Sequence, residues 1–197
     1  MQRDEVTELH FITSIENLGS ILERGILSHD RAARVNHKSV ALKDVQDRRR
    51  DKRVPNGGRL HGYANLYFHA RNPMMYYLKH NDYNDLAVIR VSPAVLDLPD
   101  AVLADGNAAS VGTRFYPSPD GLADLDSQRI FAWSWNDTDF WAKQEKKRAR
   151  NAEVLIPNLV ASRYIRGCYV DTPEKRAFCE GLDDLPTVTV NRGIFFR

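Results

Sequence analysis

The segment from Lys146 to Pro157 constrains the fold more than any other part of the chain. A run of cations leads to Glu153, and an apolar, β-branched stretch follows as far as a proline. Such a stretch is typical of a buried strand, here predicted over 154–156. The segment therefore places one carboxylate at the mouth of a strand, beside several cations. That carboxylate suits a site for a charged ligand, or it forms an ion pair with Arg148 or Arg150.

Short apolar segments and proline-led helices fill the rest of the chain and predict its fold class. Strands and helices alternate early, and strands dominate late, which favours one α+β domain over residues 1–197 without a doubly wound sheet. The chain has neither a GxGxxG nor a GxxxxGK[ST] motif, so the Rossmann and P-loop signatures are missing. The expected strands lie at 9–13, 66–70, 86–91, 101–103, 154–156, 165–170 and 187–190. The expected helices lie at 15–22, 40–50, 73–78, 93–96, 122–133, 138–148 and 173–181, and 112–121 is expected to be an irregular loop.

Composition narrows the class of protein. The 197 residues are 43% hydrophobic and 27% charged, a balance that supports a packed core. Two cysteines are too few for a disulfide scaffold, and the six histidines show no zinc-site spacing, so no metal is expected. No apolar run approaches about 18 residues, and the first residues are charged. We therefore expect a soluble protein of the cytoplasm with no membrane partner.

Two basic clusters are candidates for contact with nucleic acid. One contains Arg48, Arg49 and Arg50, and the other is the cationic run before Glu153. Charge runs are usually solvated helix faces. In a chain with a net charge of only +2, however, they suit a local phosphate-binding groove. Tryptophans 133, 135 and 141 lie near the second cluster, where they either stack on unpaired bases or anchor a loop into the core.

One histidine and one aromatic stretch are further candidates for a site. His10 lies in a predicted strand, close to a helix N-terminus that presents backbone N–H groups to a ligand. Taken alone, the position is more typical of a satisfied core histidine. Aromatic residues are dense from Tyr63 to Tyr77, and such rings can sandwich a nicotinamide or a nucleobase. By composition alone, core packing is the favoured interpretation of this stretch.

Four segments in series resemble those of the DarT family, DNA ADP-ribosyltransferase toxins of bacterial toxin–antitoxin pairs. The first runs from His10 to Ser28, and the second combines 45–49 with 54–58. The third runs from Tyr63 to Tyr76, with its Asn-Pro-Met-Met sequence, and the fourth from Lys146 to Pro157. The resemblance covers nearly the whole chain, in order.

The resemblance implies an ADP-ribosyltransferase-like fold, a split, mostly antiparallel β core with flanking helices and with NAD+ in the cleft. It implies transfer of ADP-ribose from NAD+, as a substrate, to a base in single-stranded DNA. The form of 64–68 and 71–73 favours guanine over thymine as the base. A DarG-like macrodomain antitoxin is the implied protein partner. Two alternatives stay open: an ADP-ribosyltransferase that acts on RNA or protein, and a non-catalytic nucleic-acid-binding module.

The resemblance also implies roles for residues. Glu153 takes the place of the catalytic glutamate and Arg49 that of the catalytic arginine, with its two arginine neighbours as alternatives. The implied NAD+-contacting residues are His10, Thr13, Asn17, Gly25, Tyr67, Phe68 and Met75. The predicted DNA-contacting residues are Arg48, Lys143, Lys146, Lys147, Arg148 and Arg150, and residues 118–150 are the predicted substrate-recognition loop. In the His-Tyr-Glu triad of diphtheria-toxin-like relatives, His10 and Glu153 fit the ends, and Tyr67 or Phe68 fits the middle.

Overall fold

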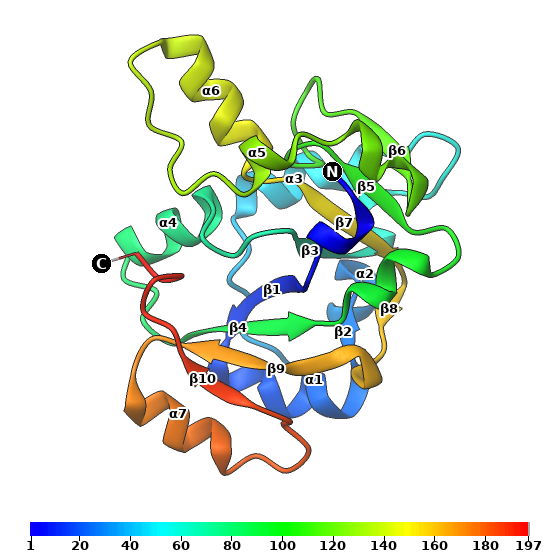
Figure 1. The fold of residues 1–197 in the computed structure, drawn as a ribbon. Coiled ribbons are helices and arrows are strands. Elements are labelled where there is room, and N and C mark those ends of the chain that lie inside the picture. Colours follow the sequence, from blue (N-terminus) through cyan, green and yellow to red (C-terminus); the bar gives the residue numbers. More distant parts are fainter. Residues whose placement is uncertain (197) are drawn as a thin grey trace.

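A mostly antiparallel sheet of eight strands organises the computed structural model, which describes residues 1–196 (Figure 1). The strand order is β10-β9-β4-β1-β3-β7-β5-β6, and within residues 1–196 only β10 and β9 pair in parallel. The strands are β1 (Leu9–Ser14), β3 (Tyr63–Tyr67), β4 (Leu86–Val91), β5 (Val102–Ala104), β6 (Phe115–Pro117), β7 (Glu153–Pro157), β9 (Ile165–Val170) and β10 (Val188–Val190). A second sheet pairs β2 (Ile26–Leu27) with β8 (Leu159–Val160).

The large sheet is split at its centre. Strand β1 pairs with β4 along its whole length, and β3 pairs with β7 along its whole length. Between β1 and β3, however, the ladder holds at one position, where His10 lies opposite Tyr67. The two strands therefore separate beyond this pair and leave room between the halves of the sheet. This arrangement confirms the predicted split, mostly antiparallel core.

Helices flank the sheet at its edges and ends (Figure 1). Four of the α-helices begin at a side-chain cap: Asn72 accepts from the backbone N–H of Met75, and Asp126, Asp139 and Thr172 cap in the same way. The α-helices are α1 (Leu18–Arg24), α2 (His29–Ala32), α3 (Lys43–Asp51), α4 (Pro73–His80), α5 (Ser127–Ile130), α6 (Phe140–Ala149) and α7 (Pro173–Glu180). Short 3-10 helices span Arg3–Glu5, Ile15–Asn17, Leu60–Gly62, Pro93–Asp97, Asp120–Asp124 and Ser162–Tyr164. None of the helices in residues 1–196 has the length and apolarity needed to cross a membrane.

Two hydrophobic clusters occupy opposite faces near the split. Leu66 and Phe68 belong to the larger cluster, with Leu9 and Val154. Tyr67, which lies between them in the chain, belongs to a second cluster that includes Met75 of α4. Side chains alternate between the faces of a strand, so neighbours in this segment are buried in different environments.

The predicted helix over 122–133 is wrong in extent. A 3-10 helix covers Asp120–Asp124, the chain is extended at Leu125, and α5 restarts at the Asp126 cap. The predicted irregular loop contains β6, which pairs with β5. Gly121 follows closely, and a Cβ there would lie 2.3 Å from the Cβ of Tyr116. Tertiary pairing and capping therefore override the local pattern in this region.

A long segment between α5 and β7 projects away from the rest of the domain. We call residues 131–149 the arm; it consists of a loop and α6, and Figure 1 shows α6 projecting from the sheet. Several large apolar side chains on it are exposed, among them Trp133, Phe140 and Trp141. The arm leads directly into Glu153, so its placement bears on the candidate site.

Candidate active site

A buried ion pair joins Glu153 to Arg49. The Glu153 side chain has 0% exposure, and Nη1 of Arg49 lies 2.9 Å from Oε2 and 3.3 Å from Oε1. The backbone N–H of Ala108 donates to Oε1 at 3.0 Å. The salt-bridge partner is therefore neither Arg148 nor Arg150, the two considered from the sequence. Burying two charges is costly, so such a pair is weak evidence for a purely stabilising role.

His10, Tyr67 and Glu153 lie in one row across three strands. His10 is opposite Tyr67 in the β1–β3 ladder, and Tyr67 is opposite Glu153 in the β3–β7 ladder. Residues directly opposite one another place their side chains on the same face. Tyr67, rather than Phe68, therefore occupies the middle of the row. Burial, with the charge of Glu153, raises the pKa of Tyr67, and its neutral phenol donates to Sδ of Met74 at 3.0 Å.

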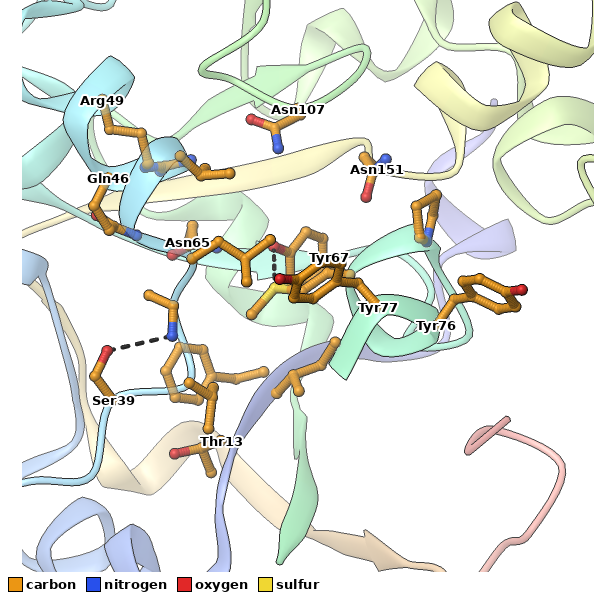
Figure 2. Close-up of a pocket in the computed structure, with 18 of the residues that line it drawn as sticks. Thr13, Ser39, Gln46, Arg49, Asn65, Tyr67, Tyr76, Tyr77, Asn107 and Asn151 are labelled. Atoms are coloured by element: carbon orange, nitrogen blue, oxygen red, sulfur yellow. Dashed lines mark hydrogen bonds between the residues drawn. The ribbon is translucent and has the colours of Figure 1, made fainter. Parts of the chain in front are cut away.

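A cavity of about 1100 Å³ opens where β1 and β3 diverge (Figure 2). Pockets for a single small ligand are roughly 300–1,000 Å³ in volume, so this one is at the upper end of that range. Five residues predicted to contact NAD+ or to act on it lie in its lining: Thr13, Asn17, Gly25, Arg49 and Tyr67.

Asn17 holds the backbone of residues 38–42, which we call the strap, along one side of the cavity. Its Nδ2 donates to Oγ1 of Thr13 at 3.0 Å and to the carbonyl of Lys38 at 2.9 Å, and its Oδ1 accepts from the Lys38 N–H. The strap, 38–42, lines the cavity. Gly25 ends α1 with a φ of 83°, and a Cβ there would lie 2.3 Å from the carbonyl oxygen of Val160. Glycine is therefore required at this wall.

Seven amide side chains in the lining were missed from the sequence, and Figure 2 labels four of them: Gln46, Asn65, Asn107 and Asn151. Gln46, Asn65 and Asn151 lie inside three of the family-like segments, which is the signal that marks them. Asn107 sits in a turn with no distinguishing pattern. Figure 2 shows all four around the same space as Arg49 and Tyr67. Amides both donate and accept hydrogen bonds, so they suit a ligand with a mixed polar edge.

Three residues predicted to contact NAD+ lie elsewhere. Phe68 is in the larger core cluster, because it faces away from Tyr67. Met75 is fully buried, and its neighbour Met74 lines the cavity instead. His10 is outside the lining; its Nε2 lies 3.1 Å from Oε1 of Glu8. The structure therefore does not place Phe68 or Met75 in the cavity wall, and His10 belongs to a polar cluster in which Glu8 also binds Arg90 and Tyr169.

The predicted DNA-contacting residues divide into three groups. Arg48, Lys143 and Lys147 line the cavity. Lys146 pairs with an aspartate at 2.7 Å, and Arg148 pairs with Asp105 at 2.6 Å and with Glu145 of its own helix. Neither of these two lies in the lining. Arg150, at 1% exposure, cannot reach a ligand in solvent, and the prediction that it contacts DNA is wrong.

Arg150 instead joins the two ends of the arm. Its Nη1 donates to the carbonyl of Ile130 at 2.7 Å, and its Nη2 donates to the carbonyl of Arg71 and lies 3.2 Å from Nδ1 of His69. Burial, with a smaller effect of Arg71, lowers the pKa of Arg150 to about 10, so the guanidinium stays charged at neutral pH. Arg150 is therefore a positioning residue for the arm.

His69 makes this junction sensitive to acid. Burial, and then the charge of Arg150, lowers the pKa of His69 from 6.5 to about 3. Nδ1 also accepts from the N–H of Arg71 at 3.0 Å, so protonation removes an acceptor from two donors. The folded pKa is below the unfolded one, so the stability that His69 contributes is complete above pH 6.5. It is lost as the pH falls toward 3.

We expect His69→Asn, which keeps an acceptor near the Nδ1 position but does not titrate, to flatten this loss. The limiting slope for one proton is about 1.4 kcal/mol per pH unit. Denaturant unfolding of both proteins between pH 6.5 and 5 measures the difference, above the range where carboxylates titrate. His29 and His61 are present in both proteins, so their titration contributes equally to both curves and does not affect the difference. Parallel curves over this window would contradict the prediction.

Comparison with known proteins identifies the family. A family model described as "ssDNA thymidine ADP-ribosyltransferase, DarT" matches residues 10–196. A DNA ADP-ribosyl transferase–DNA ADP-ribosyl glycohydrolase fusion protein of Thermosipho africanus is 35% identical over 85% of this chain. The chain spans only 43% of that protein. A DNA ADP-ribosyl transferase of Thermus sp. is 33% identical over 77% of this chain and 75% of its own length.

Solved structures agree with the sequence comparison. Thermosipho africanus DarTG in complex with ADP-ribose superposes with a TM-score of 0.83, 31% identity and coverage of 96% of this chain and 51% of that one. Thermus sp. 2.9 DarT in complex with ADP-ribosylated single-stranded DNA superposes with a TM-score of 0.84 and 25% identity. The match covers 98% of this chain and 97% of that one. This protein belongs to the DarT family of DNA ADP-ribosyltransferases.

Proposed function

We propose that this protein transfers ADP-ribose from NAD+ to a base in single-stranded DNA. The observation that carries the proposal is the buried Arg49–Glu153 pair, whose arginine lines a cavity of about 1100 Å³. The relatives support it, because one was solved with ADP-ribose and another with ADP-ribosylated single-stranded DNA. Among residues 1–196 no cluster of histidine, cysteine, aspartate or glutamate is arranged to hold a metal ion. The proposed roles therefore rest on protein side chains.

Arg49 and Glu153 have different roles in this proposal. Arg49 lines the cavity, whereas Glu153 has no exposed surface. A substrate therefore reaches the carboxylate only when the guanidinium shifts. Phosphate oxygens accept the arginine fork bidentately, so the NAD+ pyrophosphate is the group that draws Arg49 away.

The chemical step needs the carboxylate twice. Cleavage of the bond between nicotinamide and the ribose C1′ leaves its electron pair on nicotinamide and builds positive charge on the ribose. A preorganised carboxylate offsets that charge. A nitrogen of the base then bonds to C1′, and its proton passes to Glu153. The base edge is hidden in a duplex, so a single strand is the accessible substrate.

We propose guanine, rather than thymine, as the modified base. The proposal rests on the form of residues 64–68 and 71–73, which resembles the guanine-modifying branch. The amide side chains in the lining offer both donors and acceptors to such a base. Thymine is the second candidate, because the matching family model is described as a thymidine ADP-ribosyltransferase.

Mass spectrometry of defined oligonucleotides tests both proposals. Single strands of adenine and cytosine that carry one guanine, one thymine or neither are incubated with NAD+, beside RNA and protein pools. ADP-ribose on the guanine strand alone supports the proposal, and ADP-ribose on the thymine strand alone replaces guanine with thymine. Labelling of RNA or protein instead would select an alternative substrate. A protein that never consumes NAD+ would be a binding module.

We propose further that the activity is toxic and that a DarG-like macrodomain protein opposes it. The support is the Thermosipho relative, in which a DNA ADP-ribosyl transferase is fused to a DNA ADP-ribosyl glycohydrolase. Induced expression of this protein in bacteria should arrest growth, and co-expression of a DNA ADP-ribosyl glycohydrolase should restore it. Arrest that persists when the DNA modification is removed would contradict the pairing.

Lys143 and Lys147 should bind the DNA backbone. Both line the cavity, and neither forms an ion pair within residues 1–196. We expect Lys143→Glu with Lys147→Glu to weaken binding of a single-stranded oligonucleotide at low salt. The slope of log K against log salt should become shallower by about 0.7 for each phosphate that the variant no longer binds. Fluorescence anisotropy without NAD+ measures both quantities.

The matched control is Arg163→Glu with Arg166→Glu, which makes the same charge change outside the cavity lining. Equal loss of affinity in the two double variants would mean that net charge, and not a groove beside α6, attracts DNA.

A further inference from the structure

Arg71 is held between two aromatic rings that come from distant parts of the chain. Its Cζ lies 3.9 Å from the ring centroid of Phe196 and 4.8 Å from that of Trp133. Trp133 belongs to the arm. Phe196 belongs to residues 191–196, which we call the tail and which lie beside α4 in Figure 1. Nη1 of Arg71 donates to the carbonyl of Gly193 at 2.7 Å. Stacking fixes the plane of a guanidinium while its edge stays able to donate hydrogen bonds.

Among residues 1–196 no acid balances the charge of Arg71. Within residues 1–196 no carboxylate lies within ion-pair distance of it, and its buried Nε has no hydrogen-bond partner. The neighbouring Arg150 is buried, whereas Arg71 is partly exposed, and Arg150 is bound by carbonyls and His69 instead of by a carboxylate. Two adjacent guanidiniums that face no acid of residues 1–196, one of them open to the cavity, favour an anion from outside.

Arg71 faces the same cavity as the proposed catalytic pair. Arg71, Trp133 and Phe196 all line it, together with Lys143 and Lys147 of the arm. The partners of the Arg71 side chain come from the arm and the tail. The residues proposed to contact NAD+ come from another part of the chain: Thr13 lies on β1, Asn17 ends the 3-10 helix that follows it, and Gly25 comes directly after α1.

We propose that Arg71 binds a backbone phosphate of the DNA strand next to the target base, and that Trp133 and Phe196 hold its fork in place. The proposal rests on the proposed DNA activity and adds a contact that fixes the strand relative to Glu153. Arginine forks bind phosphate oxygens through two parallel hydrogen bonds, which gives position as well as affinity. The tail thus becomes a part of the substrate site.

Binding of a single-stranded oligonucleotide without NAD+ tests the proposal on the full chain. We expect Arg71→Met to raise Kd about tenfold or more, as for loss of a charge-assisted hydrogen bond. The salt slope should become shallower by about 0.7, the value for one phosphate bound in a single strand. The Kd for NAD+, measured by calorimetry, should stay the same. Phe196→Leu keeps the charge and should give a smaller rise in Kd with the salt slope retained.

A scan with neutral linkages locates the phosphate. Each phosphodiester in turn is replaced by a methylphosphonate, which removes one charge. The wild-type protein should lose affinity most at one linkage near the target base. Arg71→Met should lose nothing further there, because the two changes remove the same interaction.

Arg163→Met is the matched control. Arg163 is also an arginine over an aromatic ring, 4.8 Å from the Tyr164 centroid, but it is outside the cavity lining. Arg71→Lys replaces the methionine variant if that variant unfolds. It should still bind the single strand more weakly than the wild type, because lysine cannot form the planar fork. An unchanged Kd and salt slope in the Arg71 variants would overturn the proposal. A rise in Kd for NAD+ alone would assign Arg71 to the pyrophosphate instead. A wild-type protein that binds no single strand would refute the DNA activity itself.

Discussion

Glu153→Gln will abolish transfer of ADP-ribose to DNA and leave the protein folded. The amide keeps the size of the side chain and an oxygen that accepts from the N–H of Ala108. It loses the negative charge that offsets the developing ribose cation and the basicity that takes the proton of the base. Each effect is worth roughly 10²- to 10⁴-fold, so we expect a rate loss of at least about a thousandfold. Initial rates with labelled NAD+ and a single-stranded oligonucleotide measure it.

Glu145→Gln is the matched control, because Glu145 also pairs with arginine but lies on α6 and outside the cavity lining. It should retain wild-type transfer. The circular dichroism and NAD+ affinity of Glu153→Gln should stay near those of the wild type, which separates lost chemistry from lost structure. Transfer at the wild-type rate would reduce Glu153 to a structural partner of Arg49.

The strand that carries Glu153 was predictable because its signal is local. An apolar, β-branched run that stops at a proline specifies a buried strand wherever it occurs, and β7 is found at Glu153–Pro157. Its partner was not predictable in the same way. Arg49 is 104 residues away, in a row of three arginines. Successive residues on a helix point about 100° apart, so only the docking of α3 decides which one faces inward.

The errors at Phe68 and Met75 have one cause. Both faces of this segment are buried, so no polar alternation in the sequence marks the face toward the cavity. The register of β3 against β1 and β7 decides that Tyr67, and not Phe68, lies toward the cavity. The docking of α4 decides the same for Met74 over Met75, and no local pattern contains either.

The error at Arg150 has a different cause. The cations before Glu153 cannot be told apart by composition, but Arg150, the last of them, follows the end of α6 and its side chain points into the protein. It is satisfied by carbonyls of Ile130 and Arg71, far from it in the chain. A basic run therefore indicates a charged surface without showing which member has become part of the core.

Arg49→Met will destabilise the fold strongly, and Glu153→Gln will rescue the stability but not the activity. Removing the guanidinium leaves a fully buried carboxylate without its counter-charge, which costs about 3–5 kcal/mol. The nearby Lys52, whose pKa is lowered by burial and by Arg49, compensates in part. We therefore expect a decrease of about 3 kcal/mol in the free energy of unfolding. Denaturant titration of the wild type, both single variants and the double variant measures it.

The double variant separates the two roles of the pair. With both charges gone, the site contains a thioether and an amide that still accepts from the N–H of Ala108, so its stability should recover most of the loss. Transfer should remain at background, because neither the group proposed to attract the pyrophosphate nor the proposed base is present. If Arg49→Met were as stable as the wild type, water or Lys52 would already neutralise Glu153. The proposal that Arg49 covers the carboxylate until NAD+ draws it away would then fail.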